Sequence, residues 1–260
     1  VRAGVKVMLT GYNLETGITV SVDADIQETG ACVMPARLFF DIVRKLPDEI
    51  VSVEVNDKLQ VSIRAGASSF RITAMDADDY PELPDVNSEK GIRVPQNVLR
   101  EMISGVIFSV SENQARPIHT GCLLEVSDGG ITMVAVDSSR LARRTWHSEE
   151  PIGRELKFVV PAAALREVEK ILTDTDEPAV FTLGAKHILF QIGDATLVCR
   201  ILEGEFIDWR RVVPTKNSVI LTANVAELTN SIERVSLITS EKIKSPVRCV
   251  FGENVADLRT

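Results

Sequence analysis

The chain has 260 residues, 45% of them hydrophobic and 25% charged, which is typical of a folded protein and excludes a disordered one. This length suffices for one large domain or two ordinary ones, and no stretch approaches the roughly 20 apolar residues that a membrane helix needs. A net charge of −8 excludes a protein that is basic over its whole surface, so any charge that binds nucleic acid must be confined to one face.

Four helical segments are expected in chain order, at residues 34–46, 94–110, 160–172 and 221–237, where apolar residues recur at helical spacing. A proline opens the first and third segments, a position that a helix tolerates. The stretches that follow these two helices, residues 51–75 and 179–202, alternate apolar and polar side chains and are interrupted by Gly or Asn. This alternation predicts antiparallel strands joined by hairpins.

These elements repeat with a period of about 126 residues. Pro35 and Pro161 are 126 positions apart, and Cys122 and Cys249 are 127 apart, each at the start of an apolar strand. Residues 8–20 match residues 133–145 at nearly the same offset. One unit therefore consists of a helix, two or three strands, a second helix and several strands.

The phase of the repeat divides the chain into three domains. We expect domain I over residues 1–91 without its first helix and strand, a complete domain II over 92–217, and the N-terminal part of domain III over 218–260. The last residues, VADLRT, break off within a strand and would leave backbone pairing open. We therefore favour a fragment of a longer protein with at least three units over a two-domain protein with decayed ends.

The start of the chain and its cysteines bear on the cellular compartment. The first residues, VRAGVKVMLTGYN, lack both an initiator Met and the layout of a signal peptide, so we expect that the natural protein begins earlier. The cysteines are far apart and form no CxxC pair, which predicts a reduced, cytosolic protein with buried thiols and neither a zinc site nor a disulfide framework. They are Cys32, Cys122, Cys199 and Cys249.

Basic residues recur on the polar faces of the predicted helices. In a protein of net charge −8 this recurrence suggests one positive surface that binds phosphates without reading base sequence. No aromatic residues interleave the cations, which argues against a platform for single strands. Composition alone favours the alternative of solvated helix faces, because acidic residues are interspersed. The cations are Arg37, Arg44, Lys45, Arg100, Arg166, Lys170 and Arg234, and the interspersed acids are Asp41, Glu101, Glu167, Glu169 and Glu233.

The sequence contains only weak indications of an enzyme. The three histidines form no HExxH motif, and the chain has no GxGxxG or Walker A run. Asp76, Asp78 and Asp79 leave open a hydrolase or transferase that uses a divalent ion, although we favour an acidic connecting loop. Asp137 resembles a catalytic aspartate only superficially and is expected to turn the chain. A second alternative is a repeat adaptor that does not bind DNA.

The chain resembles the bacterial DNA polymerase III beta subunit, the beta sliding clamp family, in five segments that keep the family's order. These are LTGYNLETGI (9–18), MPARLFFDI (34–42), RPIHTGCLLE (116–125), VAVDSSRLA (134–142) and EGEFIDWRRVVP (203–214). The resemblance implies an α+β fold of repeated clamp domains, each with two helices packed on antiparallel sheets, arranged in a ring. It also implies a non-catalytic processivity subunit without cofactor or metal, which works in the cytoplasm on the nucleoid.

The resemblance implies partners and a pocket for them. The partners are duplex DNA, the polymerase III alpha subunit, the clamp loader, other proteins with clamp-binding motifs, and a second copy in a head-to-tail homodimer. An apolar slot with an arginine rim would take the anchors of an extended peptide. His119 stands where the family often has Leu, and Ile207 where it often has Pro, which affects the shape of the pocket but not its location. The pocket positions are His119, Val136, Ser138, Ser139, Arg140, Leu141, Ile207, Arg211 and Val212.

The resemblance also implies a ring interface and a pore. A strand with Phe70 and Ile72 would meet a helix end with Leu237 and Ile238 of the other copy, although plain core packing is the alternative for all four. Weak contacts with phosphates would let an enclosing ring slide without dissociating. The cations that would line the pore are Arg37, Arg44, Lys45, Arg100, Arg116, Arg166 and Lys170.

Overall fold

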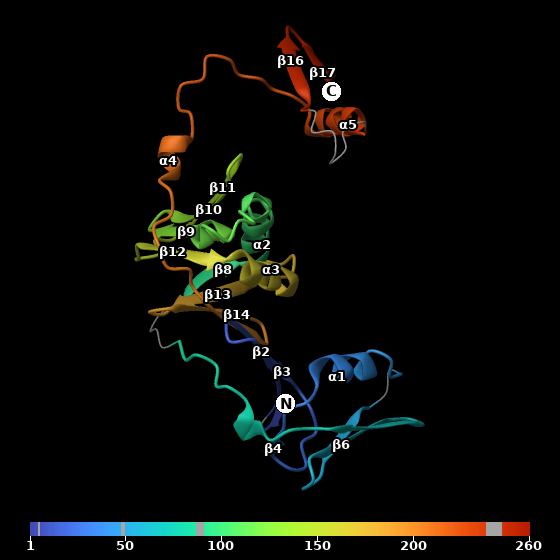
Figure 1. Cartoon of the computed structure of the whole chain (residues 1–260). Coiled ribbons are helices and arrows are strands. Elements are labelled where there is room, and N and C mark those ends of the chain that lie inside the picture. The colour runs from blue at the N-terminus through green and yellow to red at the C-terminus, as the bar shows by residue number, and fades with distance from the viewer. Residues whose placement is uncertain (5, 48–49, 87–90, 238–245) are drawn as a thin grey trace. The chain divides into compact units, whose positions relative to one another are not determined.

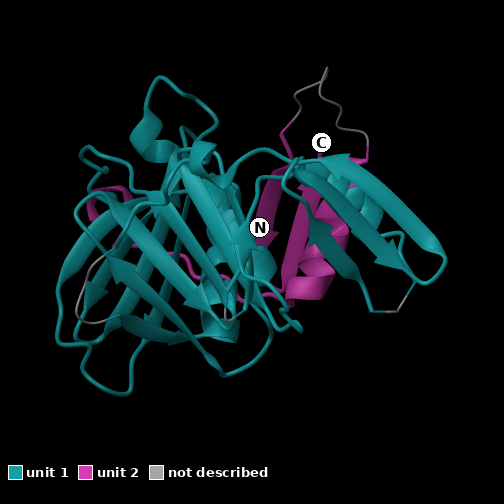
Figure 2. Cartoon of the chain, turned by 90° about the horizontal axis from the view of Figure 1, so that it is seen from below, with its two compact units in different colours: residues 1–209 teal, residues 210–260 magenta. Residues whose placement is uncertain are grey.

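The structure is a computed structural model that describes residues 1–4, 6–47, 50–86, 91–237 and 246–260 (Figure 1). It divides into two compact units, residues 1–209 and residues 210–260, which are coloured separately in Figure 2. Each unit contains both helices and antiparallel strands, so the expected α+β class is confirmed.

The first unit contains an eight-stranded antiparallel sheet in the order β4-β1-β2-β3-β15-β14-β13-β8, a four-stranded sheet β11-β10-β9-β12 and a three-stranded sheet β5-β6-β7. Its strands are β1 (Arg2–Ala3), β2 (Val7–Tyr12), β3 (Thr16–Val22), β4 (Gly30–Ala31), β5 (Ser52–Val55), β6 (Gln60–Ala65), β7 (Ser68–Thr73), β8 (Ile92–Pro95), β9 (Gly121–Ser127), β10 (Gly130–Val136), β11 (Leu141–His147), β12 (Leu156–Pro161), β13 (Pro178–Leu183), β14 (His187–Ile192) and β15 (Ala195–Arg200).

The helices of the first unit are short and connect the sheets. They are α1 (Ala36–Val43), α2 (Gln96–Ser104) and α3 (Ala162–Ile171), with three 3₁₀ helices, η1 (Ala77–Asp79), η2 (Ile107–Ser109) and η3 (Pro117–Thr120). Helix α4 (Trp209–Val212) crosses from the first unit into the second, which contains α5 (Val225–Ser236) and the paired strands β16 (Arg248–Gly252) and β17 (Val255–Arg259).

The strand order confirms the internal repeat. The order β4-β1-β2-β3 in the first half of unit 1 matches β12-β9-β10-β11 in its second half, and β5-β6-β7 matches β13-β14-β15. Two isolated bridges also correspond, since Val33 pairs with Met75 and Val159 with Leu202. The predicted hairpins after α1 and α3 are present in both copies.

Equivalent turns show why the two copies fold alike. The Asn13 side chain accepts hydrogen bonds from the N–H groups of Glu15 and Thr16, at 3.0 and 2.7 Å, between β2 and β3. The Asp137 side chain does the same between β10 and β11, where the N–H groups of Ser139 and Arg140 donate at 2.7 and 2.9 Å. Short polar side chains that satisfy the backbone in this way favour a tight turn, and the expected turn at Asp137 is confirmed.

The predicted helix boundaries were partly wrong. Residues 94–110 do not form one helix, because Val94 is buried in β8, which pairs with β13 before α2 begins. Helix α2 then ends at Ser104, and only the single turn η2 follows. Pro35, Pro95 and Pro161 each stand at the N-cap, immediately before the first helical residue rather than at it. The four helices that do form are thus shorter than their periodic sequence segments.

The main core lies where α2 and α3 pack against each other and on strands of the two larger sheets. Leu99 and Ile103 from α2, and Leu165 from α3, are at most 1% exposed. Two aromatic rings of the strands, Phe181 and Phe190, lie 6.0 Å apart beneath them. Burial of a side chain of this size stabilises the fold by about 1.5–3 kcal/mol, so this core is the principal source of stability in the second half of unit 1.

The expectation of four buried thiols holds for three of them. Burial raises the pKa of Cys122 and of Cys199 to about 12 in each case, with Arg166 partly opposing it at Cys122. Cys32 is also buried in a smaller core with Ile42 and Ile72, and burial raises its pKa. Cys249 is exposed, which corrects the prediction. It lies on β16 of a two-stranded sheet, and two strands with one helix provide too little cover to bury it.

Candidate functional site

The predicted DNA-facing cations are all exposed, but not all stand on helices. Arg37 lies on α1, Arg100 on α2, and Arg166 and Lys170 on α3. Helices α2 and α3 pack side by side, so three of these cations share one helical layer (Figure 1). The other three lie outside the helices. Arg44 and Lys45 follow α1 in a turn, which corrects their assignment to the helical segment 34–46, and Arg116 is the N-cap of η3.

Arg44 and Lys45 fall outside α1 because the helix ends at Val43. Arg44 is the C-cap of α1, and its guanidinium lies 5.6 Å from the centre of the Phe40 ring. A cation at the C-terminus of a helix is stabilised by the negative end of the helix dipole. Arg44 can therefore be held in place without a carboxylate partner.

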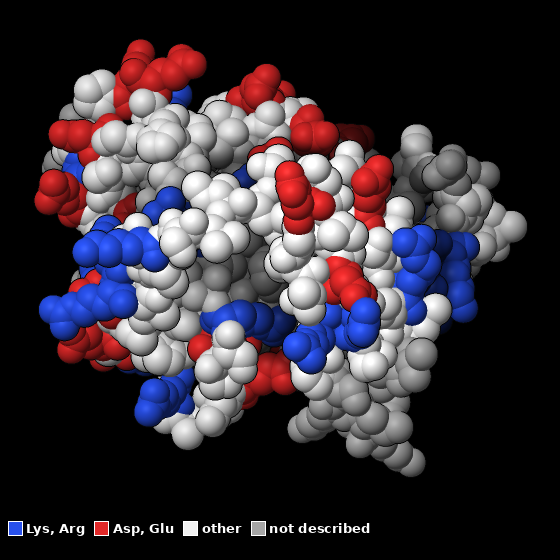
Figure 3. Space-filling view, turned by 90° about the horizontal axis from the view of Figure 1, so that it is seen from above, with Lys and Arg blue, Asp and Glu red and all other residues white. Residues whose placement is uncertain are grey.

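The ion pairs decide which cations remain available for phosphates. Lys170 forms an ion pair with Glu167 on the same helix, at 2.8 Å. Within the described part of the chain, no carboxylate lies within ion-pair distance of Arg37, Arg100 or Arg166. Figure 3 shows both basic (blue) and acidic (red) side chains on the side of the molecule that it draws, so neither sign of charge covers that side alone. Among the four predicted cations that stand on helices, Arg37, Arg100 and Arg166 are thus the ones without a carboxylate partner in the described structure.

Two of the predicted pocket residues belong to one apolar cluster in the second half of unit 1. Val136 is 7% exposed and packs in this cluster, and Leu141 is partly buried against it. His119 joins them through Phe206, whose ring centre lies 5.4 Å from that of His119 in an edge-on arrangement. Burial, and secondarily Arg116, lowers the pKa of His119. The cluster consists of Leu123, Val134, Val136, Val159, Phe206 and Trp209, bordered by Ile118, Leu141 and Leu202.

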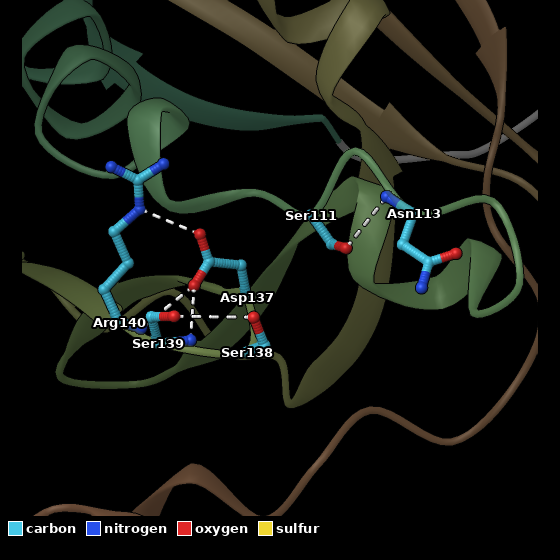
Figure 4. Close-up of polar contacts among 6 residues, drawn as sticks. All are labelled: Ser111, Asn113, Asp137, Ser138, Ser139 and Arg140. Carbon is cyan, nitrogen blue, oxygen red and sulfur yellow. Dashed lines mark hydrogen bonds and ion pairs between the residues drawn. The ribbon is translucent and has the colours of Figure 1, made fainter. Parts of the chain in front are cut away.

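The turn between β10 and β11 presents the polar pocket residues at the border of this cluster (Figure 4). Ser138, Ser139 and Arg140 are exposed there. The Asp137 carboxylate accepts from the Arg140 side chain Nε at 2.9 Å, in addition to the two backbone N–H groups of the turn. The Ser139 N–H is the main cause that lowers the pKa of Asp137; burial opposes it, and the hydrogen bonds and charge of Arg140 lower the pKa further. The turn is therefore a pre-organised element that fixes the Arg140 side chain.

The remaining pocket positions follow along the chain. Ile207 lies in the first unit and is 39% exposed. Arg211 and Val212 belong to the second unit, in the part of α4 beyond Trp209, and both are exposed. The first unit therefore brings together His119, Val136 and Leu141, with the turn 138–140 at their border.

The residue that anchors this cluster was missed by the sequence analysis. Trp209 is 6% exposed, its Nε1 donates to the Glu125 carboxylate at 3.3 Å, and the Arg143 guanidinium lies 5.3 Å from its ring centre. Trp209 was noticed only as part of the family-like segment at 203–214. The available signal for an anchor was its position nine residues after the end of β15 and three residues after Phe206.

The proposed ring-interface residues that the structure describes differ in exposure. Both Phe70 and Ile72 lie on β7, which is an end strand of its sheet. Phe70 is 38% exposed, but Ile72 is 8% exposed and packs with Ile42 of α1, so its side chain belongs to the core. Leu237 is 85% exposed, and Ile238 lies outside the described residues.

The acidic segment does not assemble a metal site in the part of the chain that the structure describes. Asp76 is the N-cap of η1, and its side chain accepts from the Asp78 N–H at 3.1 Å. No group of three or more His, Cys, Asp or Glu side chains among the described residues could hold a metal ion. None of the described helices is long and apolar enough to cross a membrane.

Comparison with known proteins covers nearly the whole chain. Residues 2–84 match the family model of the DNA polymerase III beta subunit N-terminal domain, and residues 93–208 match that of its central domain. The beta sliding clamp of Staphylococcus aureus is 31% identical over 261 aligned positions, covering 97% of this chain and 69% of the relative.

Solved structures agree with this assignment. A putative DNA polymerase III beta subunit from Eubacterium rectale has a TM-score of 0.91 at 28% identity, over 97% of this chain and 69% of that one. The DNA polymerase sliding clamp from Bacillus subtilis has a TM-score of 0.88 at 27% identity, over 99% of this chain and 73% of that one. The chain therefore belongs to the family of DNA polymerase III beta subunits, the bacterial beta sliding clamps.

Proposed function

We propose that the protein is a sliding clamp that encloses duplex DNA and tethers the replicative polymerase, and that it catalyses no reaction itself. The observation that carries this proposal is the junction between β3 and β15. These two strands, from successive copies of the repeat, pair edge to edge over five residue pairs, from Ala195 with Val20 to Cys199 with Thr16. This antiparallel junction is a way of joining one repeat to the next.

The repeat supports the same kind of junction at two further edges. Strand β11 is the counterpart of β3, and β7 is the counterpart of β15. Among the described strands, β11 and β7 each end a sheet, with an unpaired edge. Unpaired edges invite association, and head-to-tail pairing of repeats through such edges can close into a ring. We therefore propose β7 as part of the homodimer interface, with Phe70 at its surface.

The three-domain division is part of this proposal. The family matches at 2–84 and 93–208 support domain I (1–91) and domain II (92–217), whereas domain III (218–260) rests on the repeat. In the second unit, α5 followed by β16 and β17 repeats the succession of α2, β9 and β10 at an offset of about 127 residues. Three similar domains in each of two chains would enclose DNA with repeated helical layers.

The exposed arginines supply the chemistry that such an enclosure needs. Arg37, Arg100 and Arg166 present guanidinium groups without a carboxylate partner in the described structure, and such groups bind phosphates irrespective of base sequence. We also propose the apolar cluster with its 138–140 turn as the site for peptide motifs of the polymerase alpha subunit, the clamp loader and other clamp-binding proteins. A location in the cytoplasm, on the nucleoid, belongs to the same proposal.

A primer-extension assay tests this function. The replicative polymerase and its loader copy a long primed template with and without the protein, and product lengths are measured under single-encounter conditions. The clamp function predicts longer products when the protein is present. Product lengths that do not change would favour an adaptor that does not bind DNA.

A further inference from the structure

Phe40 is an exposed aromatic residue between two arginines of α1 and its C-terminal end. Its side chain is 58% exposed. Arg37 lies one turn before it, and Arg44, the C-cap, lies one turn after it, and the described residues provide no carboxylate partner for either arginine. The Arg44 guanidinium carbon lies 5.6 Å from the centre of the Phe40 ring. This placement corrects the expectation that no aromatic residue interleaves the helix cations.

The internal repeat indicates that this position stays exposed in a domain with two helices. At the offset of 126 residues, Phe40 corresponds to Arg166 of α3. Arg166 is exposed although α2 packs against α3. By contrast, the exposed Leu38 corresponds to Ala164, which is 0% exposed. Phe40 thus stands on the side of its helix that a packed neighbouring helix leaves open.

An aromatic ring at this position changes the chemistry of the proposed DNA-facing layer. A phenyl ring cannot neutralise a phosphate as Arg166 can, but it offers a flat face on which an unpaired base stacks. Arg37 and Arg44 are seven residues apart, which is about 10 Å along a helix, and they can bind phosphates on both sides of such a base. Asp41 is the only carboxylate in α1, so the two arginines outnumber it.

We propose that Phe40, Arg37 and Arg44 form a site for single-stranded DNA, in which the ring stacks on an unpaired base and the guanidinium groups bind adjacent phosphates. The inference rests on the proposed DNA-facing layer and extends it from the duplex to a single-stranded segment, such as the template beyond a primer end. Arg44 covers at most one face of the ring, so the other face can take the base. Every base has a flat π face, so the site does not select base sequence.

Anisotropy titration with two labelled single strands of equal length and charge tests the proposal. One is an oligothymidylate, and in the other abasic sites replace the thymidines. The unsubstituted protein is expected to bind the oligothymidylate more tightly. Phe40→Leu keeps an apolar side chain but removes the ring. It should weaken binding of the oligothymidylate about five- to tenfold and leave the affinities for the abasic strand and for a duplex unchanged, whereas Phe40→Tyr should keep all three.

Phe108→Leu is a matched control. Phe108 is 56% exposed and its ring centre lies 5.8 Å from a guanidinium carbon, but that guanidinium belongs to Arg140, which the Asp137 carboxylate already binds. This control should leave all three affinities unchanged. An equal loss for both single strands in Phe40→Leu would mean that the ring acts only through Arg44, and it would overturn the stacking site.

Two further outcomes separate this inference from the proposed function. An unsubstituted protein that binds duplex DNA but does not distinguish the oligothymidylate from the abasic strand would overturn the stacking site and leave the clamp function standing. An unsubstituted protein that binds neither the single strands nor the duplex at low salt would contradict the DNA-facing layer itself.

Discussion

Replacement of Arg37 and Arg166 by glutamate is expected to weaken binding to linear duplex DNA on the order of tenfold or more at low salt. Both residues are exposed, stand on equivalent helices α1 and α3, and have no carboxylate partner in the described structure. Each guanidinium that contacts a phosphate releases a counterion, so the slope of log affinity against log salt should become less steep by about 2. Anisotropy titrations of a labelled duplex over a range of KCl concentrations measure both quantities.

A second double variant controls for net charge. Arg2→Glu with Arg93→Glu changes the charge by the same amount, but these exposed arginines lie on strands β1 and β8. This control should retain the unsubstituted slope. If both double variants lost the same affinity for DNA, net charge and not the position of the arginines on helices would account for binding. An unchanged affinity of the Arg37→Glu, Arg166→Glu variant would contradict DNA binding by the helix arginines.

Trp209→Ala is expected to have the largest effect on stability, a loss of about 3–5 kcal/mol in the free energy of unfolding. The indole is almost fully buried among Phe206, Val136 and their neighbours, and its loss would leave a large cavity. It would also leave Glu125 without the indole donor. Because the same cluster forms the base of the proposed peptide site, affinity for a labelled peptide of the polymerase alpha subunit that carries its clamp-binding motif should fall as well.

Trp209→Phe separates packing from the hydrogen bond. This variant keeps most of the apolar volume and removes only the indole N–H, so the expected loss is about 1 kcal/mol. Urea unfolding followed by circular dichroism measures both losses, and anisotropy titration with the labelled alpha-subunit peptide measures the affinity of the site. A loss below 1 kcal/mol for Trp209→Ala would show that the cluster does not depend on its anchor.

The 126-residue period predicted a large part of the fold. Equivalent segments such as 34–46 and 160–172 both became helices that follow a proline, and the alternating segments after them became matching hairpins. Periodicity is a strong signal where one face of an element is buried, because the pattern must then follow the core. The periodicity did not show where the helix begins at 94–110, because strand β8, which contains Val94, is followed directly by helix α2.

The candidate site was predicted less completely than the fold, because burial depends on neighbours that lie far apart in the chain. Phe70 and Ile72 are both apolar and occupy equivalent positions in the alternating pattern of β7. Only Ile72 packs against α1 and is buried. Trp209 carries no motif of its own, and its role arises from contacts with Glu125 and Arg143, residues from distant segments. Charge on a helix could be read from the sequence, whereas the pairing of Lys170 with Glu167 required coordinates.

Retention on DNA of different topology tests enclosure most directly. The protein is loaded on closed circular duplex and washed at a salt concentration that abolishes its binding to linear duplex, and the amount retained is measured before and after a restriction enzyme cuts the circle. A ring that surrounds the double helix predicts retention on the circle and rapid release once an end is available. Equal release from circular and linear DNA would contradict enclosure and leave only electrostatic binding.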